Sequence, residues 1–163
     1  MKAPLSVKRN KRSLRFAIWS LISSTVSIWS ILAITNLSGH SLLIGSFGAT
    51  AVLLFAVPDA PLSQPRNLIG GHLISATIAV ILVATLGTNF FTIGLSVGLS
   101  IFVMYWTHTL HPPGGATAMI GVLGGVGVDF ILFPVLIGVL ILLVNALLIN
   151  NLVHHRKYPV VWF

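Results

Sequence analysis

Apolar residues fill six stretches of this chain, and short connections that contain polar residues, proline or glycine separate them. A helix that crosses a bilayer needs about 20 such residues, with about 17 near the lower limit. The stretches lie at residues 16–37, 42–57, 68–87, 90–107, 113–128 and 130–152. The second and the fifth are short and glycine-rich. We expect these two to cross a thinned region or to form half-helices covered by their neighbours.

Composition strengthens the membrane interpretation. The chain has 163 residues, of which 56% are hydrophobic and only 7% are charged, and its mean hydropathy is +1.02. A soluble domain carries about 25% charged residues. We therefore predict an all-α membrane protein, a single bundle of four to six transmembrane helices. There is no cysteine, which excludes disulfides and thiolate zinc sites.

The basic residues lie near the two ends of the chain, and their net charge is +7. Arg66 is the one Lys or Arg outside the two tails. Basic residues that flank apolar spans are the positive-inside signal and can bind anionic lipid heads. We expect the tails to contact anionic lipids and expect no nucleic-acid partner.

Three regions follow: a basic cytoplasmic tail over residues 1–15, a transmembrane domain over 16–152, and a short basic and aromatic tail over 153–163. The first apolar run is too long for the core of a signal peptide, so we expect it to be retained as a helix. We predict a multi-pass protein with both ends in the cytoplasm, in the plasma (inner) membrane if the source is bacterial.

The number of crossings stays open. Six crossings from a cytoplasmic N-terminus place all nine Lys and Arg on the cytoplasmic side. Four crossings, with the second and fifth stretches as re-entrant hairpins, give the same sidedness. Charge counting therefore does not separate the two topologies.

The tetrapeptide Gly-Ala-Thr-Ala occurs twice, at residues 48–51 and 115–118, with an offset of 67 residues. Each copy lies in a short stretch between two long ones. We predict an internal duplication, which is inverted if all six stretches cross. In inverted-repeat transporters, short helices at corresponding positions of the two halves mark the binding site.

The second copy follows a break in the apolar pattern, 108-HTLHPPGGATA-118. Unpaired backbone groups are costly in hydrocarbon, so a loose loop is not expected there. Proline is best tolerated at the first helical positions, where its missing N–H costs least. We predict that Pro112 and Pro113 open a short helix whose first N–H groups are free.

The octapeptide HPPGGATA at residues 111–118 resembles the signature of the HPP family of small integral membrane proteins. The block at residues 45–72 is similar to a first conserved region of the family, and the resemblance covers about residues 16–152. It implies four spanning helices. Some plant chloroplast members are associated with nitrite transport, so the resemblance also makes nitrite a candidate substrate.

A helix N-terminus can bind an anion through its amide groups and its dipole, and glycine lets a ligand approach the backbone. A threonine hydroxyl and a histidine N–H can add donors, and histidine can carry a proton. The predicted substrate-binding residues are His111, Pro112, Pro113, Gly114, Gly115, Ala116 and Thr117, with Gly48 and Thr50 as counterparts in the second stretch.

Simpler roles stay open for the same residues. The Pro-Pro-Gly-Gly run could be a tight turn with His111 at headgroup level. The two threonines could bond to a carbonyl one turn earlier and merely pack helices.

A second group of polar residues is predicted to form a gate or mouth: Asp59, Arg66, Asn67, His72 and His108. Asp59 and Arg66 could instead form an ion pair that stabilises their loop, and Asn67 could cap the third helix. Either intramembrane histidine could serve only as a helix–helix hydrogen bond.

We predict a small permease or channel for an inorganic anion, with nitrite first. The alternative is a membrane scaffold or regulatory subunit without transport, and the bundle could form a homo-oligomer. An enzyme is not expected, because the two carboxylates, Asp59 and Asp129, lie at stretch edges. We expect no cofactor and no metal, because the histidines of the break supply too few ligands.

Overall fold

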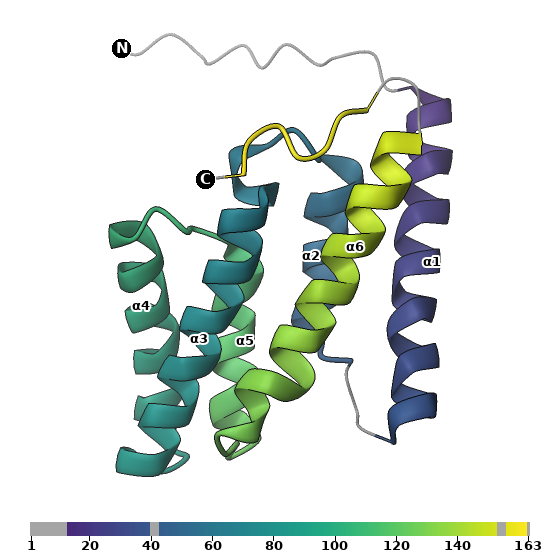
Figure 1. Ribbon diagram of the computed structural model, residues 1–163. Helices are drawn as coiled ribbons and strands as arrows, with labels where there is room; N and C mark the ends of the chain where they lie inside the picture. Colours follow the sequence, from purple (N-terminus) through teal and green to yellow (C-terminus); the bar gives the residue numbers. More distant parts are fainter. Residues whose placement is uncertain (1–12, 40–42, 153–155, 163) are drawn as a thin grey trace, which may run out of the picture.

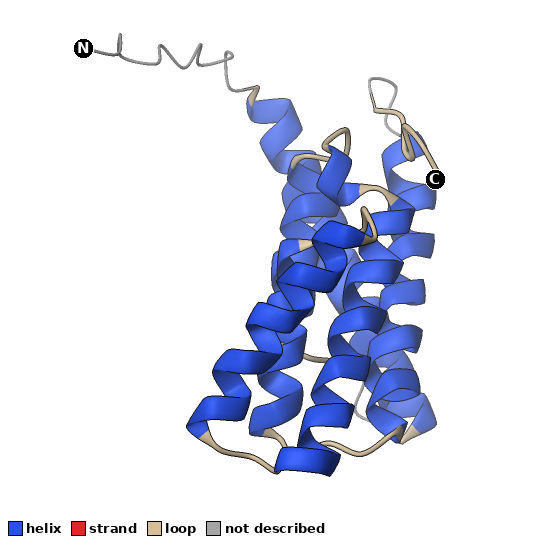
Figure 2. Cartoon of the chain, turned by 90° about the vertical axis from the view of Figure 1, so that its left-hand side faces the viewer, coloured by secondary structure: helices blue, strands red, loops and turns tan. Residues whose placement is uncertain are grey.

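The computed structural model describes residues 13–39, 43–152 and 156–162, and these residues form an all-helical bundle (Figures 1 and 2). The helices are α1 (Leu14–Ser38), α2 (Ser46–Ala56), α3 (Pro65–Leu86), α4 (Phe90–Trp106), α5 (Pro112–Leu123) and α6 (Ile137–Leu152). A 3₁₀ turn, η1 (Pro61–Ser63), precedes α3, and a π-helical segment, η2 (Ile131–Leu136), precedes α6.

Local sequence explains where several helices begin. Ser13 accepts a hydrogen bond from the Phe16 N–H and caps α1. Asn89 and Thr92 form a capping box at the start of α4. Proline occupies the first positions of α3 and α5, as predicted for Pro112 and Pro113.

The lengths of the helices separate two classes. Three described spans are long and apolar enough to cross a membrane: Leu14–Leu37, Pro65–Leu86 and Ile131–Leu152. The 17 residues of α4 are near the lower limit. The 11 residues of α2 and the 12 of α5 give lengths of only about 16–18 Å. Neither short helix reaches across a hydrocarbon core of about 30 Å.

Each short helix begins inside the bundle and reaches one end of it (Figure 1). We call the end at which α1 begins and α6 finishes the tail end. Helix α2 runs toward the tail end, whereas α5 runs the opposite way. The two short helices are therefore antiparallel. Each is about half as long as a membrane-spanning helix and ends at one end of the bundle.

The packing partners of the two halves correspond. Helix α1 packs against α2 and α6, and α4 packs against α5 and α3. Helix α5 contacts α3, and α2 contacts α6. An inverted duplication requires these contacts, because α1, α2 and α3 would then correspond to α4, α5 and α6. The duplication itself stays a prediction.

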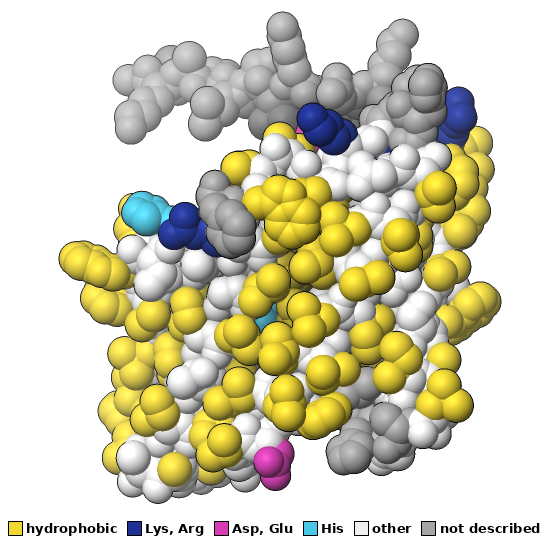
Figure 3. Space-filling view, viewed as in Figure 1, with side chains coloured by type: hydrophobic (Ala, Val, Ile, Leu, Met, Phe, Trp, Pro, Cys, Tyr) yellow, Lys and Arg dark blue, Asp and Glu magenta, His cyan; other side chains and the backbone are white. Residues whose placement is uncertain are grey.

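Buried apolar side chains join α1, α2, α3 and α6 into the main core, whose largest members include Phe47, Phe55, Leu68 and Leu142. Large apolar side chains also cover the outside of the molecule (Figure 3). An outer surface of this kind is suited to contact with lipid tails.

Two boundaries differ from the prediction. The fifth stretch was expected to be helical to residue 128, but α5 ends at Leu123 and Gly125 has a φ of 58°. The sixth stretch is broken near its start, because Phe133 is non-helical and Pro134 cannot continue the helical hydrogen bonds. Apolar composition identified these segments but did not mark their breaks.

Candidate functional site

One buried histidine joins the two Gly-Ala-Thr-Ala copies. His72 lies on α3, and its Nε2 is 2.8 Å from Thr50 Oγ1 on α2. Its Nδ1 is 2.8 Å from Thr117 Oγ1 on α5. All three side chains are 0% exposed. Threonines at equivalent places in the two short helices therefore bind opposite edges of one imidazole ring.

The hydrogen bonds continue from each threonine. Thr50 Oγ1 also lies 3.2 Å from His111 Nε2, and His111 Nδ1 lies 2.8 Å from the Leu62 carbonyl of η1. Thr117 Oγ1 lies 2.8 Å from Ser46 Oγ, at the start of α2. We call Ser46, Thr117, His72, Thr50 and His111, in that order, the polar chain.

Antiparallel packing of the short helices produces this order. The first turn of α2 lies beside the second turn of α5, so Ser46 meets Thr117. The second turn of α2 correspondingly lies near the start of α5, so Thr50 meets His111. His111 has extended backbone angles, φ −139° and ψ 102°, as expected for a residue before proline. Its ring does not cap α5, and is thus available to the polar chain.

The threonines also bond within their own helices. Thr50 Oγ1 lies 3.2 Å from the Ser46 carbonyl, and Thr117 Oγ1 lies 3.3 Å from the Pro113 carbonyl. The simpler role considered for these residues is therefore present, but it accompanies the shorter contacts to His72. His111 is likewise 0% exposed, so its ring faces the bundle interior.

The amides at the start of α5 differ from expectation. Pro112 and Pro113 have no N–H, and the Gly114 N–H donates to the His111 carbonyl at 2.8 Å. The free amides were predicted from Gly114 onward, and the prediction is wrong for Gly114, whose N–H is bonded. The polar groups in this region are hydroxyls and imidazoles.

Close helix packing surrounds the polar chain. The edge of the Phe47 ring meets the His72 ring, with centroids 5.5 Å apart. A Cβ added at Gly71 would lie 2.5 Å from His111 Cβ, and one added at Gly114 would lie 2.8 Å from the Gly71 carbonyl. These two glycines let α3 and α5 approach each other, and they leave no room for a ligand between the two backbones.

The predicted substrate-binding residues fall into two sets. His111, Pro113, Gly114, Thr117 and Thr50 are buried and face the bundle interior. The others line surface grooves: Pro112, Gly115 and Ala116 between α4 and α5, and Gly48 between α1 and α2. Whether either set binds a substrate stays a prediction.

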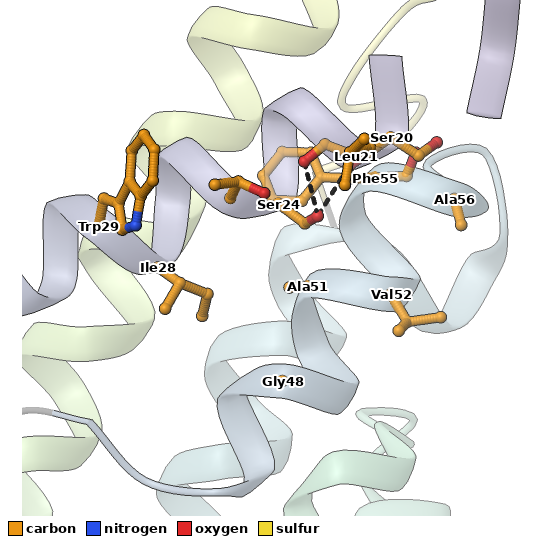
Figure 4. A pocket seen from close by; sticks show the side chains of 11 residues that line it. Ser20, Leu21, Ser24, Ile28, Trp29, Gly48, Ala51, Val52, Phe55 and Ala56 are labelled. Atoms are coloured by element: carbon orange, nitrogen blue, oxygen red, sulfur yellow. Dashed lines mark hydrogen bonds between the residues drawn. The ribbon is translucent and has the colours of Figure 1, made fainter. Parts of the chain in front are cut away.

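The two grooves are apolar and of similar size. The α4–α5 groove has a volume of about 490 Å³ and the α1–α2 groove about 530 Å³. In the α1–α2 groove, Gly48 and Ala51 face α1, where the Ser24 hydroxyl is bonded back to the Ser20 carbonyl (Figure 4). The groove walls therefore present few polar atoms that are not already hydrogen-bonded.

The mouth residues hold the start of α3 against the loop before α5. Arg66 Nη2 donates to the Thr107 carbonyl at 2.9 Å, and Asn67 Nδ2 donates to the Leu110 carbonyl at 2.8 Å. Asn67 is thus the third residue of α3 rather than its cap, because the helix already starts at Pro65. These bonds fix the segment that carries His111.

The remaining mouth residues differ in their exposure. Asp59 and His108 are exposed, and no ion pair joins Asp59 to Arg66 among the described contacts. His108 has a positive φ of 56°. His72 does not lie at a mouth, because it is fully buried in the polar chain.

Sequence reasoning missed Ser46 and the Leu62 carbonyl. A serine in an apolar segment is common in membrane helices, and a backbone carbonyl has no residue signature. A further hydroxyl, Ser75 Oγ on α3, is buried near Gly114 and has no hydrogen-bond partner among the described residues. Within that part of the chain, no three His, Cys, Asp or Glu are grouped as a metal site would require.

Comparisons with known proteins give a consistent result. The sequence model of a family described as "HPP, transmembrane region" matches residues 9–159. A transmembrane protein of Dictyostelium discoideum is 50% identical over 129 residues, which are 74% of this chain and 45% of that protein. A second transmembrane protein of the same organism is 43% identical over 157 residues, 89% of this chain and 50% of that protein. The chain thus spans about half the length of these relatives. No solved structure matches it.

Proposed function

The chain belongs to the family of the HPP transmembrane region, and from that premise we propose that it is a small permease or channel for a monovalent inorganic anion, nitrite first. The observation that carries the proposal is the convergence of Thr50 and Thr117 on His72. Two short helices, at corresponding places in the two halves, meet there at buried polar groups. Such helices mark the substrate site in inverted-repeat transporters.

The chemistry of the polar chain suits an anion. Hydroxyl and imidazole N–H groups donate hydrogen bonds, and no carboxylate is present among them to repel a negative charge. The two carboxylates of the chain, Asp59 and Asp129, lie in connections between helices. A monovalent anion needs only partial positive charges, so a site without Lys or Arg is sufficient in principle.

The described conformation is closed around this site. The polar side chains satisfy one another, and none of the three described grooves is lined by His72, Thr117 or His111. Transport would therefore require α2 and α5 to separate, so that the hydroxyls and imidazoles exchange their mutual bonds for bonds to the anion.

The same close packing favours a second candidate function, a membrane scaffold without transport. Buried polar residues in a membrane bundle can serve only to join helices, with hydrogen bonds worth about 0.6 kcal/mol on average. In a scaffold of this kind the polar chain would hold α2, α3 and α5 in place permanently.

Flux measurements separate the two candidates. The full chain is reconstituted in liposomes, and nitrite uptake down its gradient is compared with that of empty liposomes. We expect uptake, and we expect Thr117→Val to lower it because the isosteric valine removes one hydroxyl beside His72. Thr85→Val is the matched control, since Thr85 is exposed and bonds only to its own helix.

No uptake above empty liposomes, for nitrite and for nitrate, chloride and formate, would refute the anion permease and leave the scaffold. Uptake that is equal in Thr117→Val and Thr85→Val would keep transport but remove the polar chain as its site.

A further inference from the structure

The polar chain has a complete hydrogen-bond arrangement that starts from the Leu62 carbonyl. The Leu62 carbonyl can only accept, so His111 Nδ1 carries a hydrogen and donates to it. In neutral His111 the other nitrogen, Nε2, is then an acceptor. The hydroxyl that faces this nitrogen belongs to Thr50, whose Oγ1 lies 3.2 Å from both His111 Nε2 and the Ser46 carbonyl. In the arrangement that satisfies His111 Nε2, Thr50 donates to His111.

The direction then propagates through His72. Thr50 has one hydroxyl hydrogen, so it must accept from His72 Nε2–H at 2.8 Å. Neutral His72 consequently accepts at Nδ1 from the Thr117 hydroxyl. In the described geometry Thr117 donates to Ser46 Oγ, so in this arrangement the Ser46 hydroxyl turns and donates to Thr117. In this arrangement, which starts from the Leu62 carbonyl, neutral His111 carries its hydrogen on Nδ1 and neutral His72 carries its hydrogen on Nε2.

The chain has a second complete arrangement in which every bond is reversed. If one proton is added at Ser46 and each group passes one proton to the next, His111 becomes an imidazolium. His111 Nε2–H then donates to Thr50, Thr50 to His72 Nε2, His72 Nδ1–H to Thr117, and Thr117 to Ser46. Each hydroxyl oxygen gives up one proton and receives another, His72 Nε2 loses a proton while His72 Nδ1 gains one, and the net positive charge now resides on His111.

The two ends of the chain lie at different depths. Leu62 belongs to η1, at the tail end of the bundle, and its carbonyl accepts a hydrogen bond from His111, which is 0% exposed. Ser46 is the first residue of α2, inside the bundle, and is preceded by the exposed Gly45. The polar chain therefore connects the interior start of α2 with the tail end.

We propose that the polar chain is a proton relay, so that a proton moves with the transported anion. The proposal rests on the proposed function for its cargo. A cationic His111 alone in the bundle would be costly, because an isolated charge loses its hydration there. A monovalent anion that enters as α2 and α5 separate, after the proton has reached His111, cancels that charge, which couples the two movements.

The groups that face His111 agree with this role. They are His72 and Gly71 from α3, Thr50 from α2 and the Leu62 carbonyl from η1. Among the described residues, His72 is the one titratable group in this set. Its ring centroid is 5.0 Å from that of His111, and Thr50 bridges the two rings.

Tautomers read by ¹⁵N solid-state NMR test the relay. The full chain is labelled at histidine and reconstituted in lipid. It is titrated from about pH 9 to about pH 4, a range that includes the usual pKa of a histidine side chain. We expect neutral His111 to carry its hydrogen on Nδ1 and His72 on Nε2. When His111 takes its second proton, His72 should switch to the Nδ1–H tautomer.

Two substitutions isolate the bridge between the rings. Thr50→Val, which removes the hydroxyl, should leave His72 in one tautomer while His111 titrates, whereas Thr50→Ser should preserve the switch. A wild-type His72 that keeps one tautomer throughout would overturn the relay. So would a His111 that never takes a second proton, or a switch that survives in Thr50→Val.

A flux measurement tests the coupling independently. Liposomes with a trapped pH dye are exposed to a nitrite gradient, and uptake should acidify the lumen more than in empty liposomes. Thr50→Val should slow this acidification by about a hundred-fold, the size typical of losing a positioned proton-transfer group. Thr85→Val should match the wild type.

The outcomes separate the relay from the proposed function. Nitrite uptake without acidification would overturn the relay and leave the permease intact. Absence of nitrite uptake would overturn the permease, and the histidine tautomers would still decide whether the protons of the polar chain move together.

Discussion

The two Gly-Ala-Thr-Ala copies occupy equivalent places in the bundle. Thr50 and Thr117 both bond to His72, and Gly48 and Gly115 each line a groove against a neighbouring helix. In both α2 and α5, the threonine of the tetrapeptide thus faces the bundle interior, and its glycine faces a groove on the outside.

The residues just before each copy make the two helices different. Phe47 precedes Gly48, and its fully buried ring fills the space beside His72. The corresponding residue before Gly115 is Gly114, which brings the α5 backbone close to α3. One half therefore fills its interface with a large side chain, whereas the other closes it by direct contact of the backbones.

The largest expected effect comes from removing that side chain. Phe47→Ala should cost about 3–5 kcal/mol of unfolding free energy, because a fully buried ring would leave a cavity. The measurement is unfolding in mixed micelles with increasing sodium dodecyl sulfate. Phe91→Ala is the control, since Phe91 is 59% exposed on the outer surface. Equal losses in both variants would contradict a filled interface around His72.

Alanine substitutions at Gly114 and Gly48 should change the free energy of unfolding by less than Phe47→Ala does, and by different amounts. A Cβ at Gly114 would lie 2.8 Å from the Gly71 carbonyl and from Ser75 Oγ. We expect Gly114→Ala to cost about 1–3 kcal/mol, as is typical of overpacking. A Cβ at Gly48 meets nothing within 4 Å, so Gly48→Ala should be neutral or slightly stabilising.

Thermal unfolding of the two alanine variants in the same detergent makes this comparison. If Gly48→Ala were the more harmful of the two, the close approach of α3 and α5 would not be the reason for the glycine at position 114.

The smallest expected effect concerns the shared histidine. Thr50→Val and Thr117→Val should each cost about 0.6 kcal/mol, the average for a side-chain hydrogen bond between membrane helices. Because both hydroxyls bond to His72, the loss of unfolding free energy in the double variant should differ from the sum of the two single losses. Strict additivity in a double-mutant cycle would show that the two copies do not act through one ring.

Several features of the fold follow from local sequence. The apolar stretches predicted the helices, and Pro112 and Pro113 marked the start of α5. The spacing of the two copies predicted that Thr50 and Thr117 are counterparts, and the octapeptide at residues 111–118 identified the family. These properties depend on composition, proline geometry or a short motif, all of which are carried by consecutive residues.

The sequence did not show which residues form the polar chain. His72 was expected at a mouth, and Ser46 and the Leu62 carbonyl were not expected at all. The groups of the polar chain are up to 71 residues apart in direct contact, as between Ser46 and Thr117. No local pattern specifies a contact at that separation, because it depends on where two helices cross.

The sequence by itself determined a membrane bundle with two short helices that carry equivalent threonines. Tertiary structure decided that these threonines meet at one histidine, that Gly114 serves helix contact, and that Pro112 faces a groove while Pro113 faces the interior. The physical reason is that hydropathy and helix starts are set by neighbours along the chain. Hydrogen-bond partners in a bundle are set by the angle and depth at which α2, α3 and α5 pack.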